Sequence, residues 1–215
     1  KLPGARVAPM TIMYNAQLPA PLHAQLTTRP IVIVGSDGAR LLGAFKGTPM
    51  RVQRGQGEPS VWGKLLINLA NAVCALTNTT FRDLFTQPEL RQIYVAVLDE
   101  SIGLMEKAGI AYQLPMPIPY PTYRWMLLKG GPVPWWIAKL KNDLQDGAYP
   151  SMVSDLEQGR VTEVDQLNGE IVTLGQQHGI ATPVNAKIVE LIQAMQGKAP
   201  PAYFTAADLL RKLTQ

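Results

Sequence analysis

The most apolar stretch of the chain lies within residues 61–77 and repeats with the period of an α-helix. At about 100° per residue, one side of this helix carries six large apolar side chains: Trp62, Leu65, Leu66, Leu69, Val73 and Leu76. The opposite side carries one lysine and two amides at positions i, i+4 and i+7: Lys64, Asn68 and Asn71. The pattern predicts one amphipathic helix from Val61 to Thr77.

Further segments with helical periodicity follow, bounded by glycine, proline or capping residues. The predicted helices cover residues 87–108, 134–144, 151–158, 162–178, 183–196 and 205–213. Three of them have a predicted hydroxyl N-cap, which accepts hydrogen bonds from first-turn N–H groups: Ser151, Thr162 and Thr205. Residues 114–121 read LPMPIPYP, and this alternating proline predicts an extended segment.

Residues 1–60 have a different pattern. The continuous β-branched run Ile31–Val34, closed by Gly35, predicts a buried strand. A short helix is predicted over residues 39–46 and a second strand over residues 50–53, before a loop at residues 54–59. The chain is therefore predicted to be mainly α, with an α/β segment at residues 1–60 and an all-α domain at residues 61–215.

Composition excludes several classes of protein. Hydrophobic residues make up 47% of the 215 residues and charged residues 17%, which excludes a disordered chain. The net charge of +4 comes from scattered Lys and Arg residues and does not indicate a nucleic-acid partner. The single cysteine, Cys74, excludes a disulfide framework and a cysteine-based zinc site. His23 and His178 are isolated, so no metal is expected.

No membrane partner is expected either. The most apolar stretch, residues 65–76, is interrupted by Asn68 and Asn71. It is also shorter than the roughly 20 apolar residues that a helix needs to cross a bilayer. No apolar segment of the kind found in signal peptides follows Lys1. Together with the single cysteine, this favours a reducing compartment, and we expect a cytoplasmic protein.

The side of the first helix that carries Lys64, Asn68 and Asn71 has two interpretations. It carries a single charge between Val61 and Phe81, whereas a solvated helix face normally has several, so it resembles a stripe that faces a cleft. A poorly solvated lysine there has a lowered pKa and can act as a general acid or hold an anion. The other interpretation is an amphipathic helix whose lysine extends to solvent.

A second polar cluster runs through residues 151–169. Asp155 can pair with Arg160 or cap a turn. Glu163 and Asp165 follow the predicted N-cap at Thr162, where the helix dipole alone explains two carboxylates. Asn168 lies on the apolar side of the same predicted helix, so if buried it needs a hydrogen-bond partner, such as a backbone turn.

Three blocks of this sequence together resemble the ketopantoate reductase (2-dehydropantoate 2-reductase) family. They are WGKLLINLAN at residues 62–71, PSMVSDLEQGRVTEVDQLNG at residues 150–169 and HGIATPVN at residues 178–185. The proline-rich segment with tryptophans that lies between the first two blocks is also similar. The resemblance covers about residues 8–200.

The resemblance implies an N-terminal Rossmann domain followed by a helical domain of the 6-phosphogluconate-dehydrogenase-like kind. It implies reduction of 2-dehydropantoate to pantoate with NADPH, in pantothenate and coenzyme A biosynthesis. Lys64 then matches the lysine that protonates the forming alkoxide, and Glu163 the carboxylate that binds substrate and orients this lysine. Asn68 and Ser151 match substrate-binding positions, and Asn71, next to a further such position, is a candidate for the same role.

The sequence departs from the family pattern at two places. No GxGxxG motif occurs, so residues 1–60 resemble only the last part of a Rossmann domain, the cofactor-binding residues are unknown and the chain alone is expected to be inactive. A second family amide, eight residues after the lysine, is replaced by Ala72, and Asn71 comes one position earlier.

Two alternatives remain open at this point. One is a family reductase that acts on another 2-keto acid. The other is a non-catalytic helical module for dimerisation or for binding small acids, without a cofactor domain. The expected partners are a small-molecule 2-keto acid and a second copy in a homodimer.

Overall fold

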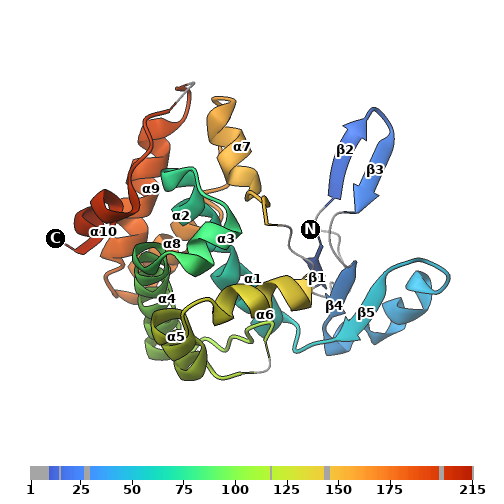
Figure 1. Cartoon of the computed structure of the whole chain (residues 1–215). Helices are drawn as coiled ribbons and strands as arrows, with labels where there is room; N and C mark the ends of the chain where they lie inside the picture. Colours follow the sequence, from blue (N-terminus) through green and yellow to red (C-terminus); the bar gives the residue numbers. More distant parts are fainter. Residues whose placement is uncertain are drawn as a thin grey trace. The chain divides into compact units, whose positions relative to one another are not determined.

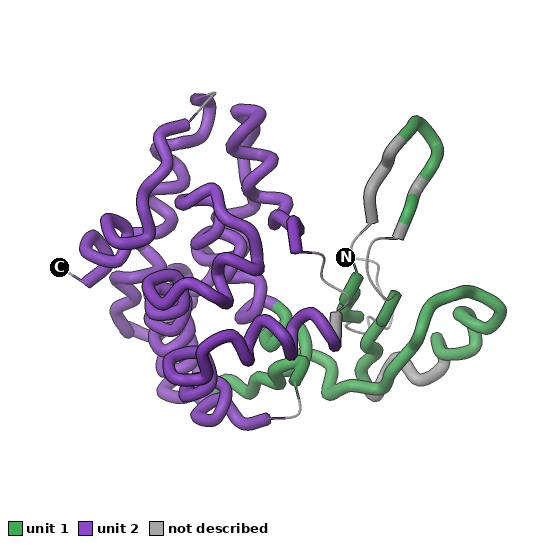
Figure 2. Tube along the Cα trace, in the orientation of Figure 1, with its two compact units in different colours: residues 1–64, 110–116 green, residues 65–109, 117–215 purple. Residues whose placement is uncertain are grey.

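The computed structural model describes residues 10–14, 16–26, 30–116, 118–142, 146–198 and 201–214. The chain forms two compact units, which Figure 2 distinguishes by colour. Unit 1 comprises residues 1–64 and 110–116, and unit 2 comprises residues 65–109 and 117–215. Among the described residues, the strands lie in unit 1 and the regular structure of unit 2 is helical, which confirms the predicted mainly α fold with a small sheet segment before it.

Unit 1 is built on a three-stranded mixed sheet of order β1-β4-β5 (Figure 1). β1 (Met10–Met13) runs antiparallel to β4 (Ile31–Val34), and β4 runs parallel to β5 (Arg51–Arg54). The predicted strand 31–34 is confirmed, and its Val32 and Val34 are buried as expected.

Two connections complete the unit. The predicted helix at residues 39–46 is a 3-10 helix, η1 (Ser36–Phe45), which links the parallel strands β4 and β5. β2 (Ala16–Ala20) and β3 (His23–Leu26) form a separate two-stranded hairpin with an irregular register.

The predicted helix at residues 61–77 forms two consecutive segments, α1 (Glu58–Asn68) and α2 (Ala70–Thr77). Leu69 interrupts the α-helical pattern, but it keeps right-handed helical dihedrals (φ −59°, ψ −20°) and its N–H donates to Leu65 O at 3.2 Å. The helix therefore continues through Leu69 with a local irregularity, and it begins three residues before the predicted Val61.

α2 lies in the core of unit 2, where it packs against α3, α4, α7, α9 and α10. By length and composition, residues Glu58–Thr77 form the one candidate membrane span within the described residues, with a mean hydropathy of 1.2. Because 61% of that apolar window is buried inside the protein, we assign it as a core helix.

The N-terminal half of α1 is held by residues 110–116, which belong to the same unit. The Gln113 N–H donates to Pro59 O at 2.8 Å, and Ser60 Oγ donates to Gln113 Oε1 at 3.0 Å. A Cβ at Gly63 would lie only 1.7 Å from Gln113 O, so glycine is required where this backbone crosses the helix. This crossing fixes the turn of α1 that carries Lys64.

The other helices of unit 2 are shown in Figure 1. They are α3 (Phe81–Thr86), α4 (Pro88–Ala108), α5 (Tyr120–Lys129), α6 (Val133–Asn142), α7 (Ser151–Glu157), α8 (Asn168–His178), α9 (Pro183–Met195) and α10 (Ala206–Thr214). α4 packs against α3, α5, α9 and α10 and ends at Gly109, whose φ of +68° suits the left-handed C-cap. The predicted helices 87–108 and 183–196 and the Thr205 N-cap are confirmed.

The predicted helix starting at Thr162 is wrong at its N-terminus. α8 begins at Asn168, and residues 162–167 form hydrogen-bonded turns instead. The Thr162 hydroxyl accepts from the Val164 N–H at 3.3 Å and from Gln196 Nε2 at 3.0 Å, so it is used by a turn and a tertiary contact. The Ser151 cap is also wrong, because Pro150 is the N-cap residue of α7 and makes no side-chain capping bond.

Candidate functional site

Lys64 and Asn68 lie one helical turn apart on α1, and both are partly buried. Asn71 lies in the first turn of α2 and is also partly buried. Of the six apolar residues predicted on the other side of this helix pair, Leu66, Leu69, Val73 and Leu76 are all at 0% exposure, whereas Trp62 and Leu65 are only partly buried. The apolar side read from the sequence is therefore confirmed for these four residues, while the roles of the three polar residues stay predictions.

The segment carrying Ser151 and Glu163 is a short helix followed by a compact turn. Ser151 is the exposed first residue of α7, and Glu163 is exposed in the turn that follows Thr162. Arg160 closes the segment, because its N–H donates to Asp155 O and its guanidinium pairs with the Asp155 carboxylate at 2.7 Å. The predicted pairing of Asp155 with Arg160 is confirmed.

The structure removes the helix-dipole explanation for Glu163 and Asp165, because neither residue lies in a helix. The Glu163 carbonyl accepts from the Gln166 N–H at 3.1 Å, so the backbone at Glu163 is fixed by a turn. Asp165 Oδ1 accepts from Gln193 Nε2 at 2.8 Å, which ties this carboxylate to α9. The two acids therefore have different surroundings, and only Asp165 makes this contact with α9.

Behind this turn lies a buried polar network that the sequence did not reveal as a whole. Asn168, at 0% exposure, donates from Nδ2 to Asn185 Oδ1 at 2.9 Å, so its partner is a side chain and not the backbone turn that the sequence suggested. Asn185 Nδ2 donates to Glu100 Oε1 at 2.8 Å and to Ser101 Oγ at 3.1 Å. Glu100 also accepts from the N–H groups of Val184 and Asn185, which caps α9 from α4.

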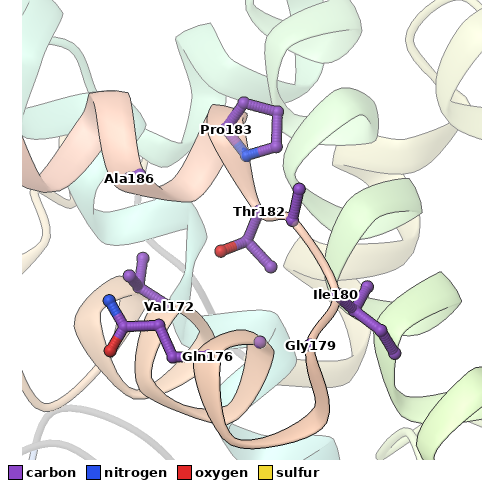
Figure 3. Close-up of a pocket in the computed structure, with 9 residues that line it drawn as sticks. Val172, Gln176, Gly179, Ile180, Thr182, Pro183 and Ala186 are labelled. Carbon is purple, nitrogen blue, oxygen red and sulfur yellow. The ribbon is translucent and has the colours of Figure 1, made fainter.

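A shallow depression of about 400 Å³ lies between the end of α8 and the start of α9 (Figure 3). Gly175 allows the close approach there, since a Cβ on it would lie 2.6 Å from Ile180 O. Gln176 and Thr182 are the polar side chains among its lining residues, which include no charged group and none of the predicted site residues. This depression therefore offers no groups for acid–base chemistry.

Buried ionisable groups in the core are poor candidates for catalysis. Burial raises the pKa of the Cys74 thiol to about 12, so the thiol is neutral and not nucleophilic. Burial likewise raises the pKa values of the Tyr94 and Tyr123 hydroxyls. Within the described ranges, no group of three His, Cys, Asp or Glu side chains is placed to hold a metal ion.

The described part of unit 1 lacks the full dinucleotide-binding motif. A Rossmann pyrophosphate site needs a glycine-rich turn between a strand and the N-terminus of an α-helix. Here the parallel strands β4 and β5 are connected by the 3-10 helix η1, and the turn from β5 to α1 contains Gly55 and Gly57 but not the third glycine of a GxGxxG motif. We therefore assign no described residue to cofactor binding.

Comparison with known proteins adds independent evidence. Residues 58–196 match the family model "Ketopantoate reductase PanE/ApbA C terminal". The 2-dehydropantoate 2-reductase of Aquifex aeolicus is 25% identical over 197 residues, covering 86% of this chain and 59% of that protein. The Vibrio cholerae enzyme of the same name is 26% identical over 149 residues, covering 65% of this chain and 41% of that protein. The chain thus spans three fifths or less of these relatives.

Solved structures share the fold at low sequence identity. The ketopantoate reductase family protein of Ralstonia eutropha JMP134 gives a TM-score of 0.66 at 21% identity, covering 97% of this chain and 60% of that chain. A dimeric ketopantoate reductase from Staphylococcus aureus gives a TM-score of 0.68 at 17% identity, covering 90% of this chain and 63% of that chain. D-mandelate dehydrogenase, solved with NADH, gives a TM-score of 0.65 at 20% identity, covering 86% of this chain and 65% of that chain. With its family match over residues 58–196, the chain belongs to the ketopantoate reductase PanE/ApbA family, as its sequence blocks indicated.

Proposed function

We propose that the protein is an NADPH-dependent reductase that converts 2-dehydropantoate to pantoate in the cytoplasm, with this chain supplying the substrate side of the site. The observation that carries the proposal is the pair Lys64 and Asn68, one turn apart on α1 within the segment that matches the family model. Both are partly buried, so a substrate bound beside them is partly shielded from water.

The chemistry assigned to this chain is proton donation and substrate binding. Reduction of a ketone builds negative charge on its oxygen, and an ammonium group can stabilise that charge and then protonate it. We assign this step to Lys64. Asn68, Asn71 and Ser151 are assigned to hydrogen bonds with the polar groups of the keto acid, and Glu163 to substrate binding and orientation of the lysine.

The identity of the keto acid is the finer part of the proposal. Several relatives at 25–26% identity are named 2-dehydropantoate 2-reductases, which favours that substrate. A second candidate is another 2-keto acid, because D-mandelate dehydrogenase shares the fold and has been solved with NADH and anilino(oxo)acetate. The shift from the family amide at Ala72 to Asn71 lies among the predicted substrate-binding residues and is a candidate specificity difference.

The test is a thermal-shift screen of the intact protein with NADPH, NADH, 2-dehydropantoate and benzoylformate, followed by turnover measurements. We expect NADPH to raise the melting temperature and 2-dehydropantoate to be reduced with the highest kcat/KM. Faster reduction of benzoylformate would replace the substrate but keep the reaction class. Absence of both cofactor binding and turnover would support the non-catalytic binding module.

A further inference from the structure

Glu163 lies between two buried residues. The exposed fraction is 5% for Thr162 and 0% for Val164, whereas Glu163 itself is exposed. Because the residues on both sides are anchored in the protein, the backbone at Glu163 has little freedom to move. The contacts that hold Thr162 and Val164 therefore determine where the Glu163 carboxylate lies.

The Thr162 hydroxyl is the hydrogen-bonding centre at the start of this turn. It accepts from the Val164 N–H at 3.3 Å, a bond that threonine commonly makes to the backbone two residues ahead. It also accepts from Gln196 Nε2 at 3.0 Å. The first bond is buried and the second is partly buried, so water competes poorly for either. One oxygen thus ties both neighbours of Glu163 to a distant residue.

Gln196 reaches Thr162 from a well-anchored part of the fold. It is the C-cap residue of α9, and its N–H donates to Ile192 O at 3.1 Å. Ile192 and Met195, in the last turn of this helix, are both buried. The Gln196 side chain is itself partly buried. A side chain that projects from such a helix end can fix a neighbouring turn, because its own backbone is held separately.

The other end of the turn has its own contacts. Val164 O accepts from the N–H groups of Leu167 and Gly169 at 3.2 and 2.9 Å, where α8 begins. Removal of the Gln196 amide leaves these bonds in place. It should therefore loosen the backbone at Glu163 without unfolding α8.

We propose that Gln196 is a positioning residue for the Glu163 carboxylate and acts through the Thr162 hydroxyl. The inference rests on the proposed function, which assigns Glu163 to substrate binding and orientation of the lysine. Gln196 itself does not touch the substrate. Its amide holds the turn in place before substrate binds, so that binding does not have to order the turn.

Gln193 is the matched control. It lies one turn earlier on α9 and also donates from Nε2 to a side chain of the turn, Asp165 Oδ1 at 2.8 Å. This bond is exposed, and its acceptor does not belong to either residue next to Glu163. Because exposed substitutions of this kind change little, Gln193→Ala should leave kcat/KM within about twofold of the wild-type value.

Steady-state kinetics of the intact protein with NADPH and 2-dehydropantoate test the proposal. Gln196→Ala should lower kcat/KM by about three- to tenfold, the range that corresponds to one lost hydrogen bond, with little change in melting temperature. Thr162→Ser keeps the hydroxyl and should retain activity. Thr162→Val removes the hydroxyl and should lose at least as much activity as Gln196→Ala.

The same substitution in a Glu163→Ala background separates positioning from a general structural effect. If Gln196 acts through Glu163, its replacement should change kcat/KM by less than about twofold once the carboxylate is absent. An equal loss in both backgrounds, or an unchanged kcat/KM in Gln196→Ala alone, would overturn the positioning role and leave the proposed function intact.

A wild type without turnover would refute the proposed function instead. The comparison then uses the dissociation constants of 2-dehydropantoate, measured by calorimetry. Weaker binding to Gln196→Ala than to the wild type, with Gln193→Ala unchanged, would support the positioning role for a binding module. Equal constants for the wild type and Gln196→Ala would overturn that role as well.

Discussion

The side-chain amide of Asn168 donates to Asn185 Oδ1 across 2.9 Å, and both residues are completely buried. Asn185 is the centre of the network, because its own amide group also donates to Glu100 and Ser101. Asn168 is peripheral, since its Oδ1 is buried without a hydrogen-bond partner among the described residues. The two asparagines therefore join α8 to α9 and, through Glu100, to α4.

Because Asn185 makes more hydrogen bonds in this network than Asn168, replacing Asn185 should destabilise the protein more. Asn185→Ala removes three side-chain hydrogen bonds and leaves Asn168 Nδ2 without its partner, so it should lower the free energy of unfolding by about 2–4 kcal/mol, whereas Asn168→Ala should cost about 1–2 kcal/mol. Urea unfolding of both variants and the double variant should show a coupling of at least about 0.5 kcal/mol. Gln177→Ala, at an exposed position on α8, should be nearly neutral. Equal losses of unfolding free energy in the two single variants, adding without coupling in the double variant, would contradict the network.

Sequence periodicity predicted well those elements whose burial is set locally. α4 and α9 have apolar residues at helical spacing and clear boundaries, and β4 is a continuous β-branched run. The extended segment predicted over residues 114–121 is wrong at its end, because α5 begins at Tyr120; Pro121 lies in its first turn, where a missing N–H costs nothing. β1 was missed because the four-residue strand depends on its distant pairing with β4.

In the candidate site, too, only the features that local sequence determines could be predicted. The Lys64 and Asn68 spacing could be read directly, because a helix fixes it over one turn. The turn at Glu163 could not, because the Thr162 hydroxyl binds Gln196, which lies 34 residues away in the sequence. Glu100 gave no signal either, since its partners on α9 come together only in the folded protein.

Gly63 provides a test of the backbone crossing next to Lys64. Gly63→Ala places a methyl group against Gln113 O, where the Cβ distance would be 1.7 Å, and should destabilise the protein by about 1–3 kcal/mol or more. Gly103→Ala is the matched control, because Gly103 lies within α4 and has open space around its Cβ position. That control should stabilise by about 0.5–1 kcal/mol. Thermal unfolding of both variants measures the difference, and a neutral Gly63→Ala would contradict the crossing.

The buried thiol of Cys74 should make the protein less stable at alkaline pH. Burial raises the pKa of its thiol to about 12, while in the unfolded chain the thiol ionises near its usual pKa of about 8.5. Between these values the unfolded state binds fewer protons than the folded state, so the free energy of unfolding falls as pH rises. The contribution of Cys74 is fully present below about pH 8 and should decrease by about 1–2 kcal/mol by pH 10.

Urea unfolding at several pH values measures this slope. Cys74→Ala should have lower stability at neutral pH, because a buried side chain is shortened, but a shallower decline between pH 8 and 10. The residual slope near pH 10 is assigned to the Tyr94 and Tyr123 hydroxyls, whose pKa values burial also raises. An unchanged slope in Cys74→Ala would show that the thiol does not contribute to it.

Lys64 and Glu163 are predicted to act as one functional unit in the intact enzyme. Lys64→Ala removes the proposed proton donor and should lower kcat by about 10²-fold or more, the usual size of a general-acid contribution. Glu163→Ala should raise KM and lower kcat, since it removes both a substrate contact and the charge that orients the lysine. The double variant should lose little more than Lys64→Ala alone, because residues that act together are not additive.

Asp165→Ala is the matched control for the carboxylate. It removes an acid two residues from Glu163, but this acid is held by Gln193 Nε2 at 2.8 Å, so its loss should affect stability slightly and leave turnover within about twofold. Steady-state kinetics of the four variants with NADPH and 2-dehydropantoate separate the two acids. If Asp165→Ala abolished turnover while Glu163→Ala did not, the assignment of Glu163 would be wrong and the functional carboxylate would be the one that contacts α9.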